Sequence, residues 1–232
     1  MSAAAKSMLA LVGLGLLGAC THAPATITLV LLDGSCSRVN LTAYQDAWTR
    51  VVETVADGDR LVLGRVTSDL REFRPDFEHA LPAKLALLDN ALDRARRIRE
   101  FDAASKSALT RALDQPCSQN TALLDTFEIA GRLLAADARP TRRLLVFSDM
   151  LEDADGVRFI AGLSESRVRQ LIEARTTAHR MAALPGVHVH VVGAAAPTPQ
   201  LAKQVERFWL AYFGAAGASL RPEHYGPVFF GW

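Results

Sequence analysis

A short, mainly apolar segment near the start of the chain, Ile27 to Leu32, is followed directly by side chains that carry oxygen. Its length and its β-forming residues predict a strand buried on both faces, as occurs in a parallel sheet covered by helices. Ligands of such a sheet bind just beyond the carboxyl ends of the strands, so Asp33, Ser35 and Ser37 are expected to line a crevice there. Carboxylate and hydroxyl oxygens, with no sulfur or imidazole among them, suit Mg²⁺ or Mn²⁺ better than Zn²⁺.

The rest of the chain alternates between strand and helix patterns, which predicts an α/β fold with a doubly wound, mainly parallel sheet and helices on both faces. Residues 82–113 are expected to form a long helical segment, either one helix or two with a break near Asp102. The segment from Asp69 to Pro82 is expected to hold at most a short edge strand. The tail from Gly226 either adds an edge strand or packs over an exposed flank. No internal repeat or low-complexity linker is found, so one domain is expected over residues 26–232.

The pattern of Asp33, Ser35 and Ser37 resembles the metal-ion-dependent adhesion site of von Willebrand factor type A (VWA) domains. The resemblance covers roughly residues 25–212 and implies the Rossmann-like VWA fold. The positions that would hold Mg²⁺ or Mn²⁺ follow the family's order in three loops: Asp33, Ser35, Ser37, Thr121 and Asp149. The resemblance implies direct coordination by the two serines, and direct or water-mediated contact by the other three side chains. Met150 departs from the family, in which a glycine commonly follows the last aspartate.

The amino terminus indicates where the protein works. A positive charge precedes an apolar stretch that ends in a small-residue cleavage site, Leu17-Gly18-Ala19-Cys20. This pattern resembles a bacterial lipoprotein signal, which implies that residues 1–19 are removed, that Cys20 carries the lipid and that residues 20–25 form a tether. Thr21 after the cysteine favours the outer membrane, with the domain facing the periplasm. An uncleaved anchor helix is the alternative, although about a dozen apolar residues are fewer than the roughly 20 that span a bilayer.

Two cysteines, Cys36 and Cys117, remain once Cys20 is assigned to the lipid. The family's geometry places the loop of Cys36 and the loop before Thr121 at the same end of the sheet, so the resemblance implies a disulfide in an oxidising compartment. Two unpaired thiols are the alternative, because a disulfide needs Cα atoms about 4.4 to 6.8 Å apart.

Arginines gather in the long helical segment, at Arg94, Arg96, Arg97 and Arg99. They could bind an anionic partner such as a lipid headgroup or a glycan phosphate. Acidic residues lie among them, however, and a solvated helix face with salt bridges is the favoured interpretation.

Two other titratable groups lie outside the proposed metal loops. The acidic segment 151–156 is expected on the rim of the crevice, where it would favour cations. His188 and His190 point to one face of a predicted strand and could form half of a zinc site. Because no third ligand of suitable spacing is nearby, two packed histidines under covering helices are favoured.

Charge and motifs restrict the classes of function. A formal net charge of +1 leaves no electrostatic footprint for nucleic acid. No nucleophile elbow, P-loop or dinucleotide fingerprint occurs, so we do not expect an enzyme.

We expect a lipid-anchored, periplasm-facing protein whose divalent cation engages a protein partner through an acidic side chain of that partner. On this interpretation Asp33→Ala abolishes metal binding and leaves the fold intact. The alternatives are a structural or assembly lipoprotein with a vestigial metal site and a hydrolase whose metal activates water.

Overall fold

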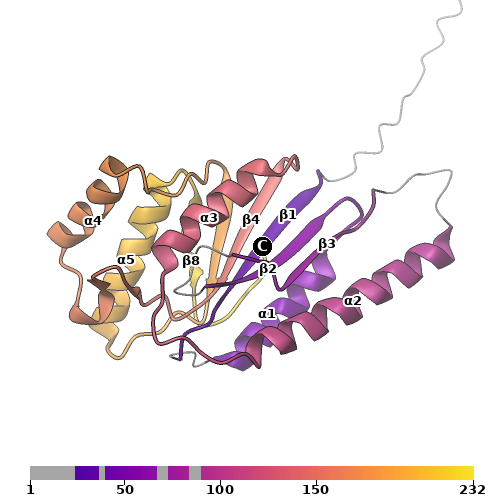
Figure 1. Ribbon diagram of the computed structural model, residues 1–232, viewed down its shortest axis with the longest axis horizontal. Helices are drawn as coiled ribbons and strands as arrows, with labels where there is room; N and C mark the ends of the chain where they lie inside the picture. Colours follow the sequence, from indigo (N-terminus) through magenta and orange to yellow (C-terminus); the bar gives the residue numbers. More distant parts are fainter. Residues whose placement is uncertain (1–23, 37–39, 67–72, 84–89) are drawn as a thin grey trace, which may run out of the picture.

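The computed structural model describes residues 24–36, 40–66, 73–83 and 90–232, and within them six strands form one sheet in the order β3-β2-β1-β4-β7-β8 (Figure 1). The strands are β1 (Thr26–Asp33), β2 (Arg60–Val66), β3 (Phe77–Ala80), β4 (Thr141–Phe147), β7 (Val187–Val192) and β8 (Ser219–Gly226). All neighbours run parallel except β3, which pairs antiparallel with β2. The predicted fold class is confirmed, and it is consistent with the Rossmann-like fold that the VWA resemblance implies. Strand β3 is the expected short edge strand.

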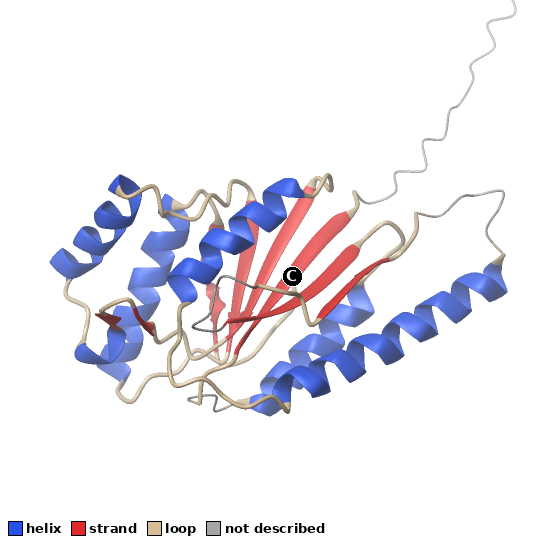
Figure 2. Ribbon diagram, in the orientation of Figure 1, coloured by secondary structure: helices blue, strands red, loops and turns tan. Residues whose placement is uncertain are grey.

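Helices cover both faces of this sheet (Figure 2). On one face lie α1 (Leu41–Thr54) and α2 (Ala91–Leu113), and on the other α3 (Leu123–Ala136), α4 (Glu165–Thr177) and α5 (Pro199–Ala215). Alternate residues of β1 enter the two cores, since Leu31 packs with α3 and α5 whereas Leu32 packs with α1. All eight residues of β1 are buried, which confirms the predicted strand covered on both faces.

The long helical segment is one helix over the part that the structure describes. Helix α2 continues past Asp102 without a break, and Asn90 caps its start by accepting a hydrogen bond of 2.9 Å from the backbone N–H of Leu92. Residues 81–83 are not helical, so the predicted start at Pro82 was wrong, and residues 84–89 lie outside the described residues. Within the described residues, no helix is both long enough and apolar enough to cross a membrane.

The carboxyl-terminal part contains a strand that the sequence patterns did not predict. Strand β8 extends the sheet beside β7, and the tail after it turns back onto the sheet. Phe229 and Trp232 pack against the ring of His190, with ring centroids 5.5 and 4.8 Å away. Of the two possibilities for the tail, packing over a flank is the one observed.

The parallel strands end together, which places several loops at one edge of the sheet. Asp33 lies opposite Val66 on β2, and Leu32 lies opposite Phe147 on β4. The chain after β4 continues into a small hairpin, β5 (Asp153–Ala154) with β6 (Val157–Arg158), and a single 3₁₀ turn, Phe159–Ala161. This carboxyl edge is where the candidate site forms.

Candidate functional site at the carboxyl edge of the sheet

Asp33 is buried at the end of β1, where only 1% of its surface is exposed, and it organises two loops. Its Oδ1 accepts a hydrogen bond of 2.7 Å from the backbone N–H of Ser35, and its Oδ2 accepts one of 2.6 Å from the hydroxyl of Ser148. The Ser148 hydroxyl in turn accepts the backbone N–H of Met150 at 2.9 Å. Ser148 was missed in the sequence because its role depends on the adjacency of β1 and β4. Asp33 therefore fixes the loop after β1 to the loop after β4.

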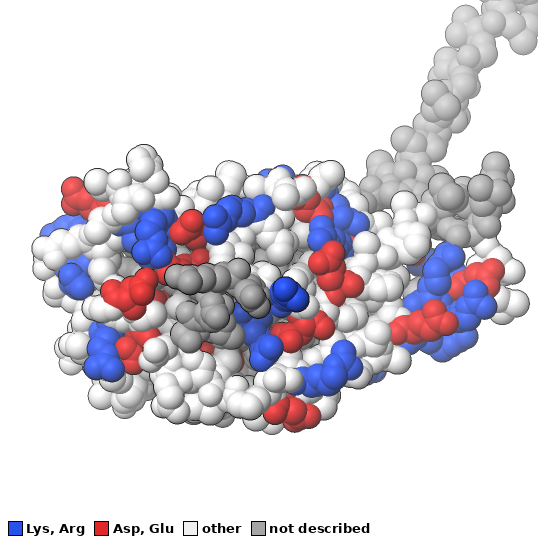
Figure 3. All heavy atoms as spheres, viewed as in Figure 1, with Lys and Arg blue, Asp and Glu red and all other residues white. Residues whose placement is uncertain are grey.

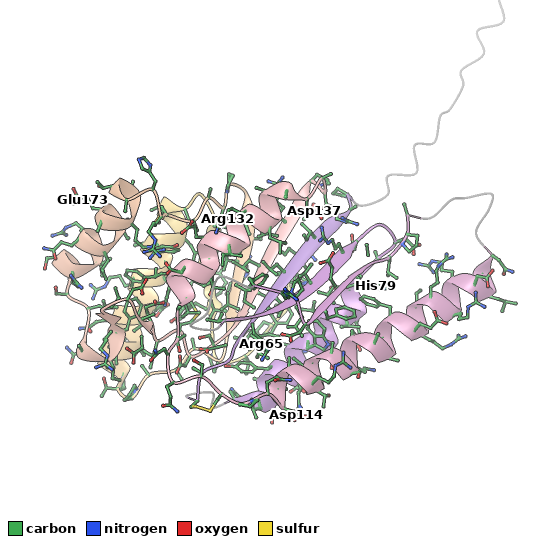
Figure 4. The ribbon with its side chains drawn as sticks, viewed as in Figure 1. Arg65, His79, Asp114, Arg132, Asp137 and Glu173 are labelled. Carbon is green, nitrogen blue, oxygen red and sulfur yellow. A yellow bond between two sulfur atoms is a disulfide. The ribbon has the colours of Figure 1, made fainter. Side chains whose placement is uncertain are left out.

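The loop of Ser35 is fastened to the segment that precedes Thr121. The backbone N–H of Cys36 donates to the carbonyl of Ser118 at 2.9 Å, and the N–H of Ser118 donates to the carbonyl of Gly34 at 2.7 Å. A disulfide joins Cys36 to Cys117 with a Cα–Cα distance of 4.9 Å, which confirms the predicted pair; it is the yellow bond at the lower edge of Figure 4. Ser37 lies outside the described residues.

The segment of Thr121 is also joined to the loop after β4. Thr121 and Asp153 exchange two backbone hydrogen bonds, of 3.2 and 2.9 Å. The side chain of Glu152 accepts the backbone N–H of Leu124 at 3.0 Å, in the first turn of α3. Because Ala122, the residue at the N-cap of α3, offers no side-chain hydrogen bond, Glu152 caps this helix from another loop. All three loops of the predicted site are thus connected pairwise.

Asp149 is buried in a sharply turned loop. Its Oδ1 accepts the backbone N–H of Leu151 at 2.9 Å, and its carbonyl accepts the N–H of Ala195 at 3.3 Å. Met150 adopts a positive φ of 67°, a conformation that favours glycine. The position where the VWA family commonly has glycine therefore has a backbone suited to glycine, while the Met150 side chain is buried in the core.

The connected loops surround a pocket of about 420 Å³. Its lining contains two of the predicted ligands, Ser35 and Thr121, together with Cys36, Gln119, Leu151, Glu152, Asp153 and Ile160. Asp33 and Asp149 are not part of the lining. Two of the four predicted ligands within the described residues therefore line the pocket, and the other two do not. The carboxylates in the lining belong to Glu152 and Asp153.

Glu152 belongs to the acidic segment 151–156, which was expected on the rim of the crevice, but its side chain is buried. Burial raises the pKa of Glu152 to about 8, against the opposing effect of hydrogen bonds from the backbone of Leu124 and Leu123, so this carboxyl is largely protonated at pH 7. Asp153 is partly exposed and forms a salt bridge of 2.8 Å with Arg158. Of these two acids, only Asp153 behaves as a rim residue.

The donor set of the site can be tested against the expected cation. The described part contains no group of three or more histidine, cysteine, aspartate or glutamate side chains placed to hold a metal. Of the predicted ligands, two carboxylates and two hydroxyls belong to described residues: Asp33, Asp149, Ser35 and Thr121. Oxygen donors with so few carboxylates fit Mg²⁺, which keeps several of its waters when it binds to protein.

The two histidines of β7 do not form a metal site with any third residue of the described ranges. His190 is buried and stacks on His224 of β8, with ring centroids 3.8 Å apart, whereas His188 is exposed. The covering groups are His224 and the carboxyl-terminal tail rather than helices, which corrects the expectation of two histidines packed under helices. Burial, together with the nearby His224 and arginines, lowers the pKa of His190 to about 3.

Comparisons with known proteins concern the fold alone. No protein-family model and no curated protein sequence matches the chain. Among solved structures, the chain is similar to the PilB minor pilin from Streptococcus sanguinis with a TM-score of 0.54 and 10% identity, over 88% of this chain and 57% of that one. Weaker likenesses are to von Willebrand factor type A from Catenulispora acidiphila (TM-score 0.46, 14% identity, 84% and 43% coverage) and to the pilus adhesin SpaC from Lactobacillus rhamnosus GG (0.48, 12%, 89% and 28%). The chain spans between 28% and 57% of the length of these three structures.

Proposed function

We propose that this protein is a lipid-anchored, periplasm-facing binding protein that uses a divalent cation to engage a protein partner. The observation that carries the proposal is that Ser35 and Thr121, from segments far apart in the sequence, line one pocket whose loops are fixed to each other.

Each residue of the proposed site has a distinct role. Ser35 and Thr121, two residues of the pocket lining, would contact the cation through their hydroxyls, and Ser37 would be the third hydroxyl ligand that the sequence motif predicts. Asp33 and Asp149, which are buried and do not line the pocket, would supply negative charge directly or through ordered water. A bound Mg²⁺ or Mn²⁺ would leave a coordination position for an acidic side chain of the partner. Binding requires no chemical turnover, in keeping with the expectation of a non-enzymatic protein.

The metal site is tested by isothermal titration calorimetry of the mature protein with Mg²⁺ and with Mn²⁺. Thr121→Val removes a proposed hydroxyl ligand at nearly constant volume and should weaken binding at least tenfold. Thr176→Val is the matched control, because this threonine is exposed on α4. Equal affinity for the cation in Thr121→Val and in wild type, or no binding by either, would defeat the proposal. Binding of metal with no effect of a chelator on partner capture would instead support a structural role.

The proposed location is tested separately. Residues 1–23 lie outside the described residues, so the proposal rests on the signal-like sequence that ends at Cys20. Mass spectrometry of the mature amino terminus should find an acylated Cys20 as the first residue. An unmodified chain that retains Met1 contradicts the anchor.

A further inference from the structure

The first ten residues of α2, residues 91–100, extend past the edge strand β3 in Figure 1 and form what we call the α2 arm. None of them is among the buried residues of the helix, which begin at Phe101. Leu92 is 77% exposed, although it is a large apolar side chain. The arm therefore contributes little to the core, and its surface is available for another contact.

One outward stripe of the arm combines this leucine with two arginines. Leu92, Arg96 and Arg99 follow each other at spacings of four and three residues, which places them on one face of a helix. All three are exposed. Phe101, Ala108 and Leu109 mark the buried face, which lies on the opposite side. Basic side chains next to an exposed apolar one are typical of helices that lie against a membrane surface.

The charge of the arm is positive on balance. It contains four arginines and two acids, Asp93 and Glu100. Arg96 contacts both acids, at 2.9 and 3.9 Å, but these pairs are exposed and contribute little stability. Figure 3 shows the resulting mixture of basic and acidic side chains at this end of the molecule. Because exposed pairs of this kind exchange partners readily, the guanidinium of Arg96 can turn to a phosphate, which it binds in bidentate geometry.

The arm lies at the same end of the sheet as the start of the domain. Arg94 forms a salt bridge of 2.8 Å with Asp57, and Asp59, two residues further on, accepts a hydrogen bond of 2.7 Å from the backbone N–H of Thr26 at the start of β1. Thr26 is six residues after Cys20, which limits the span between them to about 20 Å in a fully extended chain. A lipid on Cys20 would therefore keep the arm close to the membrane.

We propose that Leu92, Arg96 and Arg99 contact the headgroup region of an anionic phospholipid membrane and so orient the domain, with the carboxyl edge of the sheet directed away from the bilayer. This inference rests on the proposed lipid anchor. It assigns the arginines of α2 a role besides their salt bridges. It also explains why the cation pocket and the tether lie at opposite edges of the sheet: the pocket would face the periplasm.

The test uses the mature lipidated protein reconstituted in vesicles of phosphatidylcholine alone or with an equal part of phosphatidylglycerol. Ala91→Cys introduces an exposed thiol at the start of the arm for a fluorophore, and a quencher carried on lipid headgroups reports contact. Cys36 and Cys117 do not compete for the label because they are joined. We expect quenching in the anionic vesicles that weakens at high salt. The ratio of molecules whose arm contacts the membrane to molecules whose arm is free should fall about fivefold for each arginine replaced in the double variant Arg96→Gln and Arg99→Gln. Leu92→Ser should lower this ratio as well.

The matched control is Arg167→Gln with Arg169→Gln, two exposed arginines of α4 on the other face of the sheet, which should leave the quenching unchanged. If the protein floats with both kinds of vesicle but its label is quenched in neither, or equally in both, the membrane contact is wrong while the anchor stands. The contact is equally wrong if the α4 control lowers quenching as much as the α2 variant does. Protein that floats with neither kind of vesicle refutes the anchor, and the inference falls with it.

Discussion

Replacing Asp33 separates its role in the fold from its proposed role in binding a cation. Asp33→Ala removes the acceptor of two buried hydrogen bonds, from the Ser35 N–H and the Ser148 hydroxyl. Leaving a buried donor unsatisfied costs about 1 to 3 kcal/mol, so the two together should lower the free energy of unfolding by about 2 to 6 kcal/mol. These hydrogen bonds correct the expectation from the sequence that Asp33→Ala leaves the fold unaffected. Asp33→Asn keeps an acceptor for Ser35 and can donate to Ser148, and it should cost only about 1 to 2 kcal/mol.

Urea denaturation followed by circular dichroism, in buffer with a chelator, measures these differences without a contribution from metal. Asp46→Ala on the exposed face of α1 is the control and should change the free energy of unfolding by less than about 0.5 kcal/mol. Calorimetry then compares cation binding in the Asn variant, whose fold is retained. The reasoning is refuted if Asp33→Ala is as stable as Asp33→Asn or more stable than wild type, since the two buried hydrogen bonds would then contribute no measurable stability.

Further expectations follow from the same loops. Burial raises the pKa of Glu152 from 4.5 to about 8, so between these pH values the folded state keeps a proton that the unfolded state loses. In buffer with a chelator, the free energy of unfolding should therefore fall as the pH rises from 4.5 to 8. A series of urea titrations measures this fall, and Glu152→Gln should abolish it. Replacing Cys36 and Cys117 by serine removes a crosslink between residues 81 apart in sequence. On the chain-entropy model this should lower the free energy of unfolding by roughly 4 to 5 kcal/mol. The midpoint of urea unfolding should fall, and an unchanged midpoint would contradict this. Met150→Gly removes the strain of a positive φ, which should stabilise the fold by about 1 kcal/mol. It also removes a buried side chain, and the cavity left behind should destabilise the fold by about 2 to 5 kcal/mol. The melting temperature of the variant should therefore be lower than that of wild type.

The elements that the sequence predicted well are those whose pattern is local. Strand β1 has a continuous buried run, and α1 starts after Asn40, whose side chain accepts the backbone N–H of Ala43. Strand β8 was missed because it is a largely exposed edge strand containing Pro222, which has neither the alternation nor the β-forming residues of a buried strand. The start of α2 was predicted too early because the leucines before the capping residue Asn90 have the same spacing as the apolar residues of the helix.

The candidate site shows the same division between local and long-range information. The motif of Asp33 and Ser35 could be found in the sequence because its residues are adjacent on one loop. Ser148 and Glu152 could not, since their partners are 115 and 28 residues away and become neighbours only when the strands and α3 assemble. A single hydroxyl or carboxyl group forms no sequence motif that could be recognised. Whether such a side chain is buried is decided by tertiary packing.

The charge of the assembled loops gives a physical reason for a divalent cation. Asp33, at the end of β1, and Asp149, in the loop after β4, are two buried acids of these loops. Glu152 adds no negative charge at pH 7 because burial keeps it protonated, and Asp153 is balanced by its salt bridge with Arg158. The proposed cation, with a charge of +2, would balance the carboxylates of Asp33 and Asp149 without an excess on either side. The hydroxyls of Ser35 and Thr121 add oxygen donors without adding charge. The proposed site would therefore match in charge a divalent cation that keeps some of its waters, one of which a carboxylate of a partner would replace.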